Sequence, residues 1–181
     1  MFAKLYQIYA HDFTESKFET QTIKFWILNL ALFIVPFFFG QPQLLIGSIV
    51  NFGLIYMALN FKRNELLPAI FLPSIATVLH GVVWGPLTIY IAVLMPLIWL
   101  GNAVLVLGIR YLVLTKKSTW LALLVSGIAK TLVLFLGTLL LIGLFNFPQA
   151  LLLLMGVLQL GTVIIGSAAY IVLKVSTSNK K

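Results

Sequence analysis

Residues 118–145 constrain the fold more than any other part of the chain, because every position in this stretch is apolar, small or hydroxylated except Lys130. A helix that crosses a bilayer needs about 20 mostly apolar residues, so the stretch is long enough to cross one with some tilt. A lysine near the middle of such a helix costs roughly 2.5–3.5 kcal/mol on insertion scales, and it usually faces a bundle interior or a wet cavity. The stretch therefore predicts a membrane bundle with a polar interior.

The composition of the 181-residue chain indicates the same class of protein. Hydrophobic residues make up 61% of it and charged residues only 9%, whereas soluble domains carry about 25% charged residues. The chain has no cysteine, which excludes disulfides, thiolate catalysis and iron–sulfur or zinc sites built on cysteine. The net charge of +8 is typical of basic cytoplasmic loops, so we expect a lipid bilayer as a partner and no nucleic acid.

Turn residues and charged connections divide the chain into six apolar spans. The predicted spans are residues 24–40, 44–61, 66–84, 87–113, 118–145 and 149–174. We expect residues 1–23 to form a cytoplasmic or interfacial N-terminal segment, residues 24–174 a six-helix transmembrane domain, and residues 175–181 a cytoplasmic tail. The predicted fold class is therefore all-α, a polytopic membrane protein with six transmembrane helices.

The cationic residues predict the orientation of this bundle. All twelve Lys and Arg residues except Lys130 fall at the termini or at the second-to-third and fourth-to-fifth connections, and the other three connections carry no charge. Basic loops stay in the cytoplasm, so both termini are predicted to be cytoplasmic (N-in/C-in), which requires an even number of spans. The short tails fit a multi-pass protein of a bacterial inner (plasma) membrane.

Polar side chains inside the predicted spans mark a candidate pocket. Counted along the helices, they gather in the outer half and end near mid-depth, whereas the inner half is almost purely apolar. This distribution predicts a pocket that is entered from outside and has no water-filled path to the cytoplasm. The residues expected to bind a ligand are Asn51, His80, Trp84, Asn102, Lys130 and Gln159.

Each candidate also has a structural interpretation. The two asparagines and Gln159 could be interhelical hydrogen-bond partners, worth about 0.6 kcal/mol on average, and His80 and Trp84 could be interfacial anchors. Lys130 lies roughly 18 Å along its helix from Ser118, too far to snorkel easily, and no acid lies in the spans to pair with it. The lysine could be neutral, could cap carbonyls freed near Pro73 or Pro96, or could meet an anionic ligand.

Small residues on the last two spans predict close helix contacts. These strips are expected to pack inside the bundle, which would turn Lys130 and Gln159 away from lipid. They comprise Ala122, Ser126, Ala129, Val133 and Gly137 on the fifth span, and Gly156, Gly161, Thr162, Gly166 and Ala169 on the sixth.

No pattern in the sequence indicates catalysis. There is no glycine-rich phosphate loop and no HExxH pair. The two histidines, His11 and His80, are predicted to lie on opposite sides of the membrane, so an intramembrane protease would lack its partner groups. We therefore expect a protein that is not an enzyme and that uses no metal or cofactor.

Four segments carry a resemblance to a known family: QLLIGSIVNFGLIY (43–56), LLPAIFLPSIATVLHGVVWGP (66–86), PLIWLGNAVLVL (96–107) and FPQALLLLMGVLQLGTVIIG (147–166). With the six N-in/C-in spans, residues 24–174 resemble the substrate-binding S components of energy-coupling factor (ECF) transporters, and specifically an uncharacterised bacterial subgroup of S-component-like membrane proteins. The resemblance implies a bundle that binds a vitamin-like or similar small solute near its outer face. It also implies delivery through a transmembrane coupling protein with two ATPases. The first span differs from the Ala-x-x-x-Ala docking face common in S components, because it has only Ala31.

The leading hypothesis is therefore a membrane-embedded, solute-binding subunit of an uptake transporter. In it, Trp84 would supply an aromatic wall, the amide side chains would give directional hydrogen bonds, and Lys130 would meet a carboxylate or phosphate. Two alternatives stay open. One is a non-catalytic structural subunit or scaffold of cell-envelope machinery. The other is a stand-alone secondary carrier or a proton-linked device, which would need a polar path to the inner side.

Overall fold

The structure, a computed structural model, describes residues 18–39, 41–81 and 85–178, and every regular element in these ranges is a helix. Two of the helices are single 3-10 turns that precede α4 and α5, and α7 is a short helix that precedes α8. The elements are α2 (Phe18–Phe38), α3 (Gln43–Asn60), η1 (Arg63–Glu65), α4 (Leu66–His80), η2 (Gly85–Leu87), α5 (Thr88–Leu114), α6 (Thr119–Phe145), α7 (Ala150–Met155) and α8 (Val157–Ser178).

Five helical segments of the described chain are long and apolar enough to cross a membrane, which indicates a multi-pass membrane protein. α4 is shorter. Its 15 residues extend about 22 Å at 1.5 Å per residue, less than the hydrocarbon thickness of about 30 Å. The predicted third span, residues 66–84, therefore exceeds the described helix, which ends at His80, and a sixth crossing stays a prediction.

Other helix boundaries also differ from the predicted spans. α2 begins at Phe18 rather than at residue 24, and α8 continues to Ser178. The predicted last span is divided at Gly156, whose backbone angles of φ −106° and ψ −92° are not helical. A side chain at this position would come within 2.7 Å of the Leu152 carbonyl oxygen, so the break is shaped for glycine.

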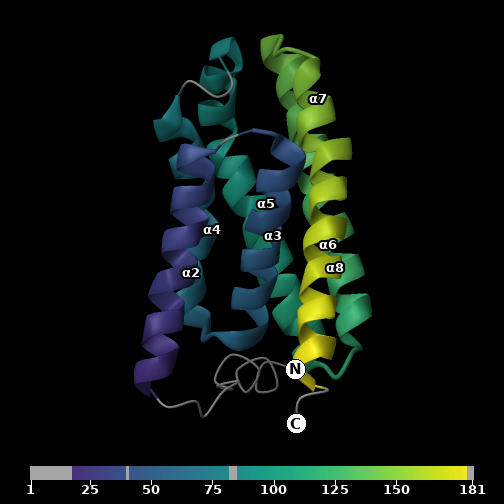
Figure 1. Ribbon diagram of the computed structural model, residues 1–181. Coiled ribbons are helices and arrows are strands. Elements are labelled where there is room, and N and C mark those ends of the chain that lie inside the picture. The colour runs from purple at the N-terminus through teal and green to yellow at the C-terminus, as the bar shows by residue number, and fades with distance from the viewer. Residues whose placement is uncertain (1–17, 40, 82–84, 179–181) are drawn as a thin grey trace.

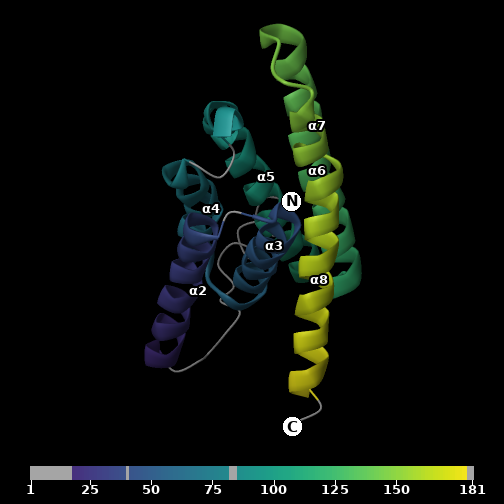
Figure 2. The same cartoon turned by 45° about the horizontal axis from the view of Figure 1, so that its top comes forward.

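The helices are arranged side by side with their long axes roughly aligned (Figure 1). In both ribbon views α3 and α5 lie between α2 and α4 on one side and α6, α7 and α8 on the other (Figures 1 and 2). The most extensive contacts pair α5 with α6, α3 with α8, and α2 with α4. α3 and α5 also contact each other, so they form the centre of the bundle and their facing side chains form its interior.

The two central helices cross their neighbours at small residues. A Cβ atom added at Gly166 of α8 would lie 2.8 Å from the backbone nitrogen of Phe52 and 2.9 Å from the carbonyl oxygen of Ser48 on α3. On the other side, a Cβ added at Gly108 of α5 would lie 2.7 Å from the Oγ atom of Ser126 on α6. Glycine at these positions lets the backbones approach closely, as is common between membrane helices.

The predicted packing strips are confirmed only in part. On α6 the buried side follows an i, i+4 row through Lys130, so Ala129, Val133 and Gly137 are only partly buried. On α8, Thr162 and Gly166 are buried as expected, whereas Ala169 is exposed and its predicted burial is wrong. The buried row on α6 consists of Ala122, Ser126, Lys130, Leu134 and Thr138.

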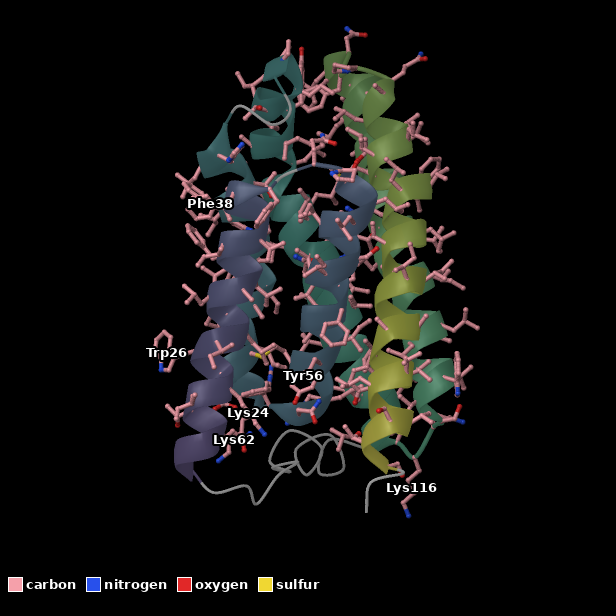
Figure 3. All side chains as sticks on the ribbon, in the orientation of Figure 1. Lys24, Trp26, Phe38, Tyr56, Lys62 and Lys116 are labelled. Carbon is pink, nitrogen blue, oxygen red and sulfur yellow. The ribbon has the colours of Figure 1, made fainter. Side chains whose placement is uncertain are left out.

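Charged residues gather at one end of the bundle. Lys24 and Lys62 lie at this end on the α2 side, and Lys116 lies across the bundle at the same end (Figure 3). The side chain of Trp26 points outward from α2 above Lys24 (Figure 3). Tryptophan is enriched where a membrane meets water, so an exposed Trp26 is consistent with a membrane surface at this depth.

The bundle next to this basic end is filled with aliphatic side chains. Buried residues of α3, α5 and α6 form a continuous hydrophobic cluster there, and the buried Arg110 donates a hydrogen bond to the Phe61 carbonyl beyond the end of α3. The cluster closes this half of the bundle, and its central members are Leu54, Ile55, Leu105, Val106, Ile109 and Leu123.

We expect the Gly166→Ala variant to unfold at a lower temperature than the wild type. The added methyl group would press on two backbone atoms of α3, and overpacking of this kind costs about 1–3 kcal/mol. Gly143→Ala is the matched control because nothing lies within 4 Å of its added Cβ. Thermal unfolding in detergent measures both variants, and equal melting temperatures would contradict the described α3–α8 crossing.

Candidate functional site

Lys130 is held inside the bundle by two side-chain amides. Only 3% of the residue is exposed. Its Nζ atom donates to the Oδ1 atom of Asn51 on α3 at 2.6 Å and to the Oδ1 atom of Asn102 on α5 at 2.9 Å. The predicted inward orientation of Lys130 is confirmed, and its nearest polar partners are two neutral oxygens rather than a carboxylate.

The orientation of both amides follows from what their nitrogens contact. The Nδ2 atom of Asn102 donates to the Ile70 carbonyl of α4 at 3.0 Å, and a carbonyl can only accept. The Nδ2 atom of Asn51 donates to the Oγ1 atom of Thr162 at 2.9 Å, and this hydroxyl gives its own proton to the Gln159 carbonyl at 2.8 Å. Both asparagines must therefore present oxygen to Lys130.

This network connects separate helices through one amine. Lys130 comes from α6, its two acceptors from α3 and α5, and the chain of bonds ends on α8 and α4. The sequence suggested that Lys130 could cap a carbonyl freed near Pro73, but its described bonds go to two amides. The carbonyl of Ile70, three residues before Pro73, accepts from Asn102. Hydrogen bonds arranged in series polarise one another, so the network fixes the amine more firmly than either bond would alone.

A cavity of about 110 Å³ lies beside this network. Its walls come from the end of α2, the beginning of α3, the second half of α4 and the first half of α5, with one residue each from α6, α7 and α8. It therefore occupies the half of the bundle opposite the basic end. Lys130 and the two asparagines form its inner end, next to the aliphatic cluster. The polar residues that line it are Gln43, Asn51, Ser74, Thr77, Asn102, Lys130 and Gln159.

Few polar atoms of the lining are available to a ligand. The Oγ atom of Ser74 donates to the Phe71 carbonyl and accepts from the Nε1 atom of Trp99, and the hydroxyl of Thr77 donates to the Pro73 carbonyl. A lysine ammonium has three N–H donors, of which the asparagines use two. Gln43 donates to the Leu154 carbonyl at 3.4 Å, and its buried Oε1 atom has no partner in the described part of the chain.

Four of the six residues expected to bind a ligand are brought together. Asn51, Asn102, Lys130 and Gln159 all line the cavity. His80 does not line it; its ring packs edge-on against Phe37, with ring centroids 6.1 Å apart. Trp84 lies outside the described residues, so its predicted role as an aromatic wall stays a prediction.

The sequence prediction left Gln43 and Ser74 out of the ligand-binding set. The sequence did carry a signal for Gln43. Gln43 and Asn51 are eight residues apart on α3, and helical neighbours at i, i+4 and i+8 share one face. Gly47 lies between them and also lines the cavity. A search for polar residues in helical register with Asn51 would have found Gln43.

The lining has no group suited to hold a metal. It contains no Asp, Glu, His or Cys, and within the described ranges no three such residues come together. The chemistry that these walls support is hydrogen bonding and charge attraction by an amine.

Comparisons with known proteins identify no relative, because no family model, no curated protein and no solved structure matches the chain.

We expect Thr162→Val to destabilise the bundle by about 1 kcal/mol, because it leaves the Asn51 amide without an acceptor. Thr138→Val is the matched control: both residues are fully buried, but the Oγ1 atom of Thr138 has no hydrogen-bond partner in the described structure. Removing that hydroxyl should be neutral or stabilising. Thermal unfolding measures the stability of each variant relative to the wild type. An equal loss of stability in both variants would contradict the described hydrogen-bond network.

Proposed function

We propose that the protein is a membrane-embedded, solute-binding subunit of S-component type in an uptake transporter, and that it takes a small anionic metabolite from the outer face. The single observation that carries this proposal is the position of Lys130, a buried amine in the wall of a cavity whose surface is otherwise mostly apolar. An amine in a low-dielectric site attracts carboxylate or phosphate more strongly than it would in water.

The break between α7 and α8 supports an anionic solute. α8 begins at Val157, and Gln159 in its first turn lines the cavity. The first backbone N–H groups of a helix have no partner within it and give that end a partial positive charge. Interrupted membrane helices in transporters direct such ends at anionic groups of their substrates.

The distribution of polar groups supports binding rather than conduction. Beyond Asn51, Asn102 and Lys130 the interior continues as the aliphatic cluster, which offers no hydrogen bonds to a solute on its way inward. A bundle of this kind needs another component to open its inner half. The transmembrane coupling protein with two ATPases that the resemblance implies would fill that role.

A structural subunit of cell-envelope machinery is the second candidate, and one observation favours it. Both amides and two of the three Lys130 donors are already bonded to protein groups, so the network also serves to hold five helices together. In that case the cavity would contain only water and the apolar outer surface would carry the function.

We expect a solute from a panel of small carboxylates and phosphate esters to raise the melting temperature of the purified protein by several degrees at saturation. The Lys130→Met variant should lose this shift, because the donor that meets the anion is gone. Lys117→Met is the control, since Lys117 is exposed at the basic end.

A second variant changes the cavity wall without breaking a side-chain hydrogen bond of the described bundle. Gln159→Leu removes a half-buried amide that no side-chain hydrogen bond ties to the described bundle, so its unliganded melting temperature should stay near that of the wild type. The proposal fails if no compound of the panel shifts the wild-type protein, or if Lys130→Met retains the full shift.

The N-in/C-in orientation in a bacterial inner membrane is tested with single cysteines, because the chain has none of its own. Lys62→Cys and Lys117→Cys should react with a membrane-impermeant maleimide only after the cells are opened. Asn146→Cys should react in intact cells. Reaction of Lys62→Cys and Lys117→Cys from opposite sides would show that α4 does not cross the membrane.

A further inference from the structure

We propose that the anionic solute binds in this cavity together with one proton, which the Lys130 amine takes up as the anion binds. This inference rests on the proposed solute-binding function and adds a second ligand, the proton, to the same site. Three observations lead to it: the amine has no counter-charge in the described structure, its hydrogen bonds there are complete without a third donor, and no other titratable group lines the cavity.

The first observation concerns charge. Three of the four acids of the chain precede residue 20, and the fourth is Glu65, whose Oε2 atom accepts from the Lys62 amide at the basic end. The cavity lining contains no acid, and the aliphatic cluster lies between it and the basic end. Proteins retain a buried charge when it is paired and hydrogen-bonded. The empty site offers an ammonium no such partner, so we expect the amine to be neutral there.

The hydrogen bonds of the amine match a neutral NH2 group. Such a group has two N–H donors and one lone pair, whereas an ammonium has three donors and no acceptor. The Oδ1 atoms of Asn51 and Asn102 accept from Nζ, and Nζ has no third partner in the described part of the chain. An ammonium in the empty site would therefore carry an unmet donor as well as an unpaired charge.

The two asparagines are not free to turn their amides toward a different state of the amine. The Nδ2 atom of Asn102 is bonded to the Ile70 carbonyl. The Nδ2 atom of Asn51 is bonded to the Thr162 hydroxyl, whose own proton goes to the Gln159 carbonyl. Either amide, if turned, would lose its bond and present N–H groups to the amine. The amine therefore keeps two donors on the asparagines, and its third position is the one that changes.

An anion at the amine requires the proton. A carboxylate or phosphate oxygen accepts hydrogen bonds, and a neutral amine with two bonded N–H groups has no donor left for it. When the Nζ lone pair takes a proton from water, the third N–H and the positive charge form in one step. The anion accepts that N–H and balances the charge, so the cavity gains no net charge. An anion that prefers the charged amine must also tighten proton binding by the same factor.

No other titratable group of the surrounding described helices is placed to take up this proton. Lys130 is the only one on α6, and α7 has none. The rings of Tyr56 and Tyr170 pack against each other, and His80 packs against Phe37. The titratable residues of α3, α4, α5 and α8, none of which lines the cavity, are Tyr56, His80, Tyr90, Arg110, Tyr111, Tyr170 and Lys174.

The first measurement needs no solute. The full-length protein is labelled with 13C-lysine and studied by NMR in detergent, and the 13Cε signal of Lys130 is identified by its absence from Lys130→Met. The shift of this carbon depends on whether the amine is charged. At about pH 8 an ordinary lysine is charged, and we expect this state for the exposed Lys117 and the neutral state for Lys130. A charged Lys130 without solute would overturn the inference and leave the proposed function intact.

The second measurement counts protons. The probes are acetate, benzoate and methanesulfonate, which are all anionic at this pH and bring no proton of their own. Titration calorimetry in Tris and in triethanolamine, two cationic buffers with different ionisation enthalpies, gives the protons exchanged per anion bound. We expect uptake of about one proton, and an affinity that falls about tenfold for each further pH unit, because the neutral amine must first be protonated.

The outcomes separate this inference from the proposed function. A probe that binds without proton uptake would reject the proton and retain a solute-binding subunit. Binding of none of the three would reject the inference, and the melting-temperature panel then decides the proposed function separately.

Asn51→Asp supplies the missing charge within the protein. Its carboxylate would accept from the Lys130 amine, and the Thr162 hydroxyl can rotate to donate to it. Asn102→Asp, by contrast, would set a carboxylate oxygen against the Ile70 carbonyl, which can only accept. We expect Asn51→Asp to hold a charged amine without solute, to take up no proton, and to bind acetate at least tenfold more weakly than the wild type.

Asn146→Asp is the matched control, because it adds the same charge at an exposed position at the end of α6. It should keep the proton uptake of the wild type. Uptake that persists unchanged in Asn51→Asp would contradict the assignment of the proton to Lys130. The NMR and calorimetric measurements on the wild-type protein remain decisive even if Asn51→Asp does not fold.

Discussion

The hydrogen bonds from Lys130 to Asn51 and Asn102 are the constraint on which the rest of the structure depends. A lysine at mid-depth in a membrane is costly unless polar groups surround it, and here two amide oxygens do so. Because those oxygens belong to α3 and α5, the amine fixes how α6 packs against the two central helices. The further bonds to Thr162 and to the Ile70 carbonyl extend the same constraint to α8 and α4.

The network can hold the helices together and also present the Lys130 amine to a ligand in the cavity. An asparagine that holds the amine by its oxygen leaves the third N–H of the ammonium in a fixed direction, and a group held in this way binds without first losing freedom of its own. Elsewhere in the lining, the Nε2 atom of Gln43 donates to the Leu154 carbonyl at 3.4 Å.

Much of the fold could be predicted from the sequence because bilayer thickness and backbone hydrogen bonding leave few solutions for long apolar stretches. The same physics placed Lys130 inside the bundle. It could not place His80, because a residue at a helix end can turn toward the cavity or toward Phe37, and contact with Phe37 is a tertiary choice. It also missed Gln43, since depth counted along the chain does not say which face a residue takes until the helical register is considered.

The interruption at Gly156 has a mechanical consequence. A continuous helix resists bending through its hydrogen-bond ladder, whereas a single residue with non-helical angles joins α7 to α8. α7 carries Met155, which lines the cavity, and Leu154, whose carbonyl holds Gln43. Rotation about the backbone bonds of Gly156 would move Met155 and the Leu154 carbonyl together. The amine and its two amides, on α6, α3 and α5, would stay in place. The wall that α7 contributes is thus joined to α8 through one non-helical residue, whereas the Lys130 amine and its two amides lie within uninterrupted helices.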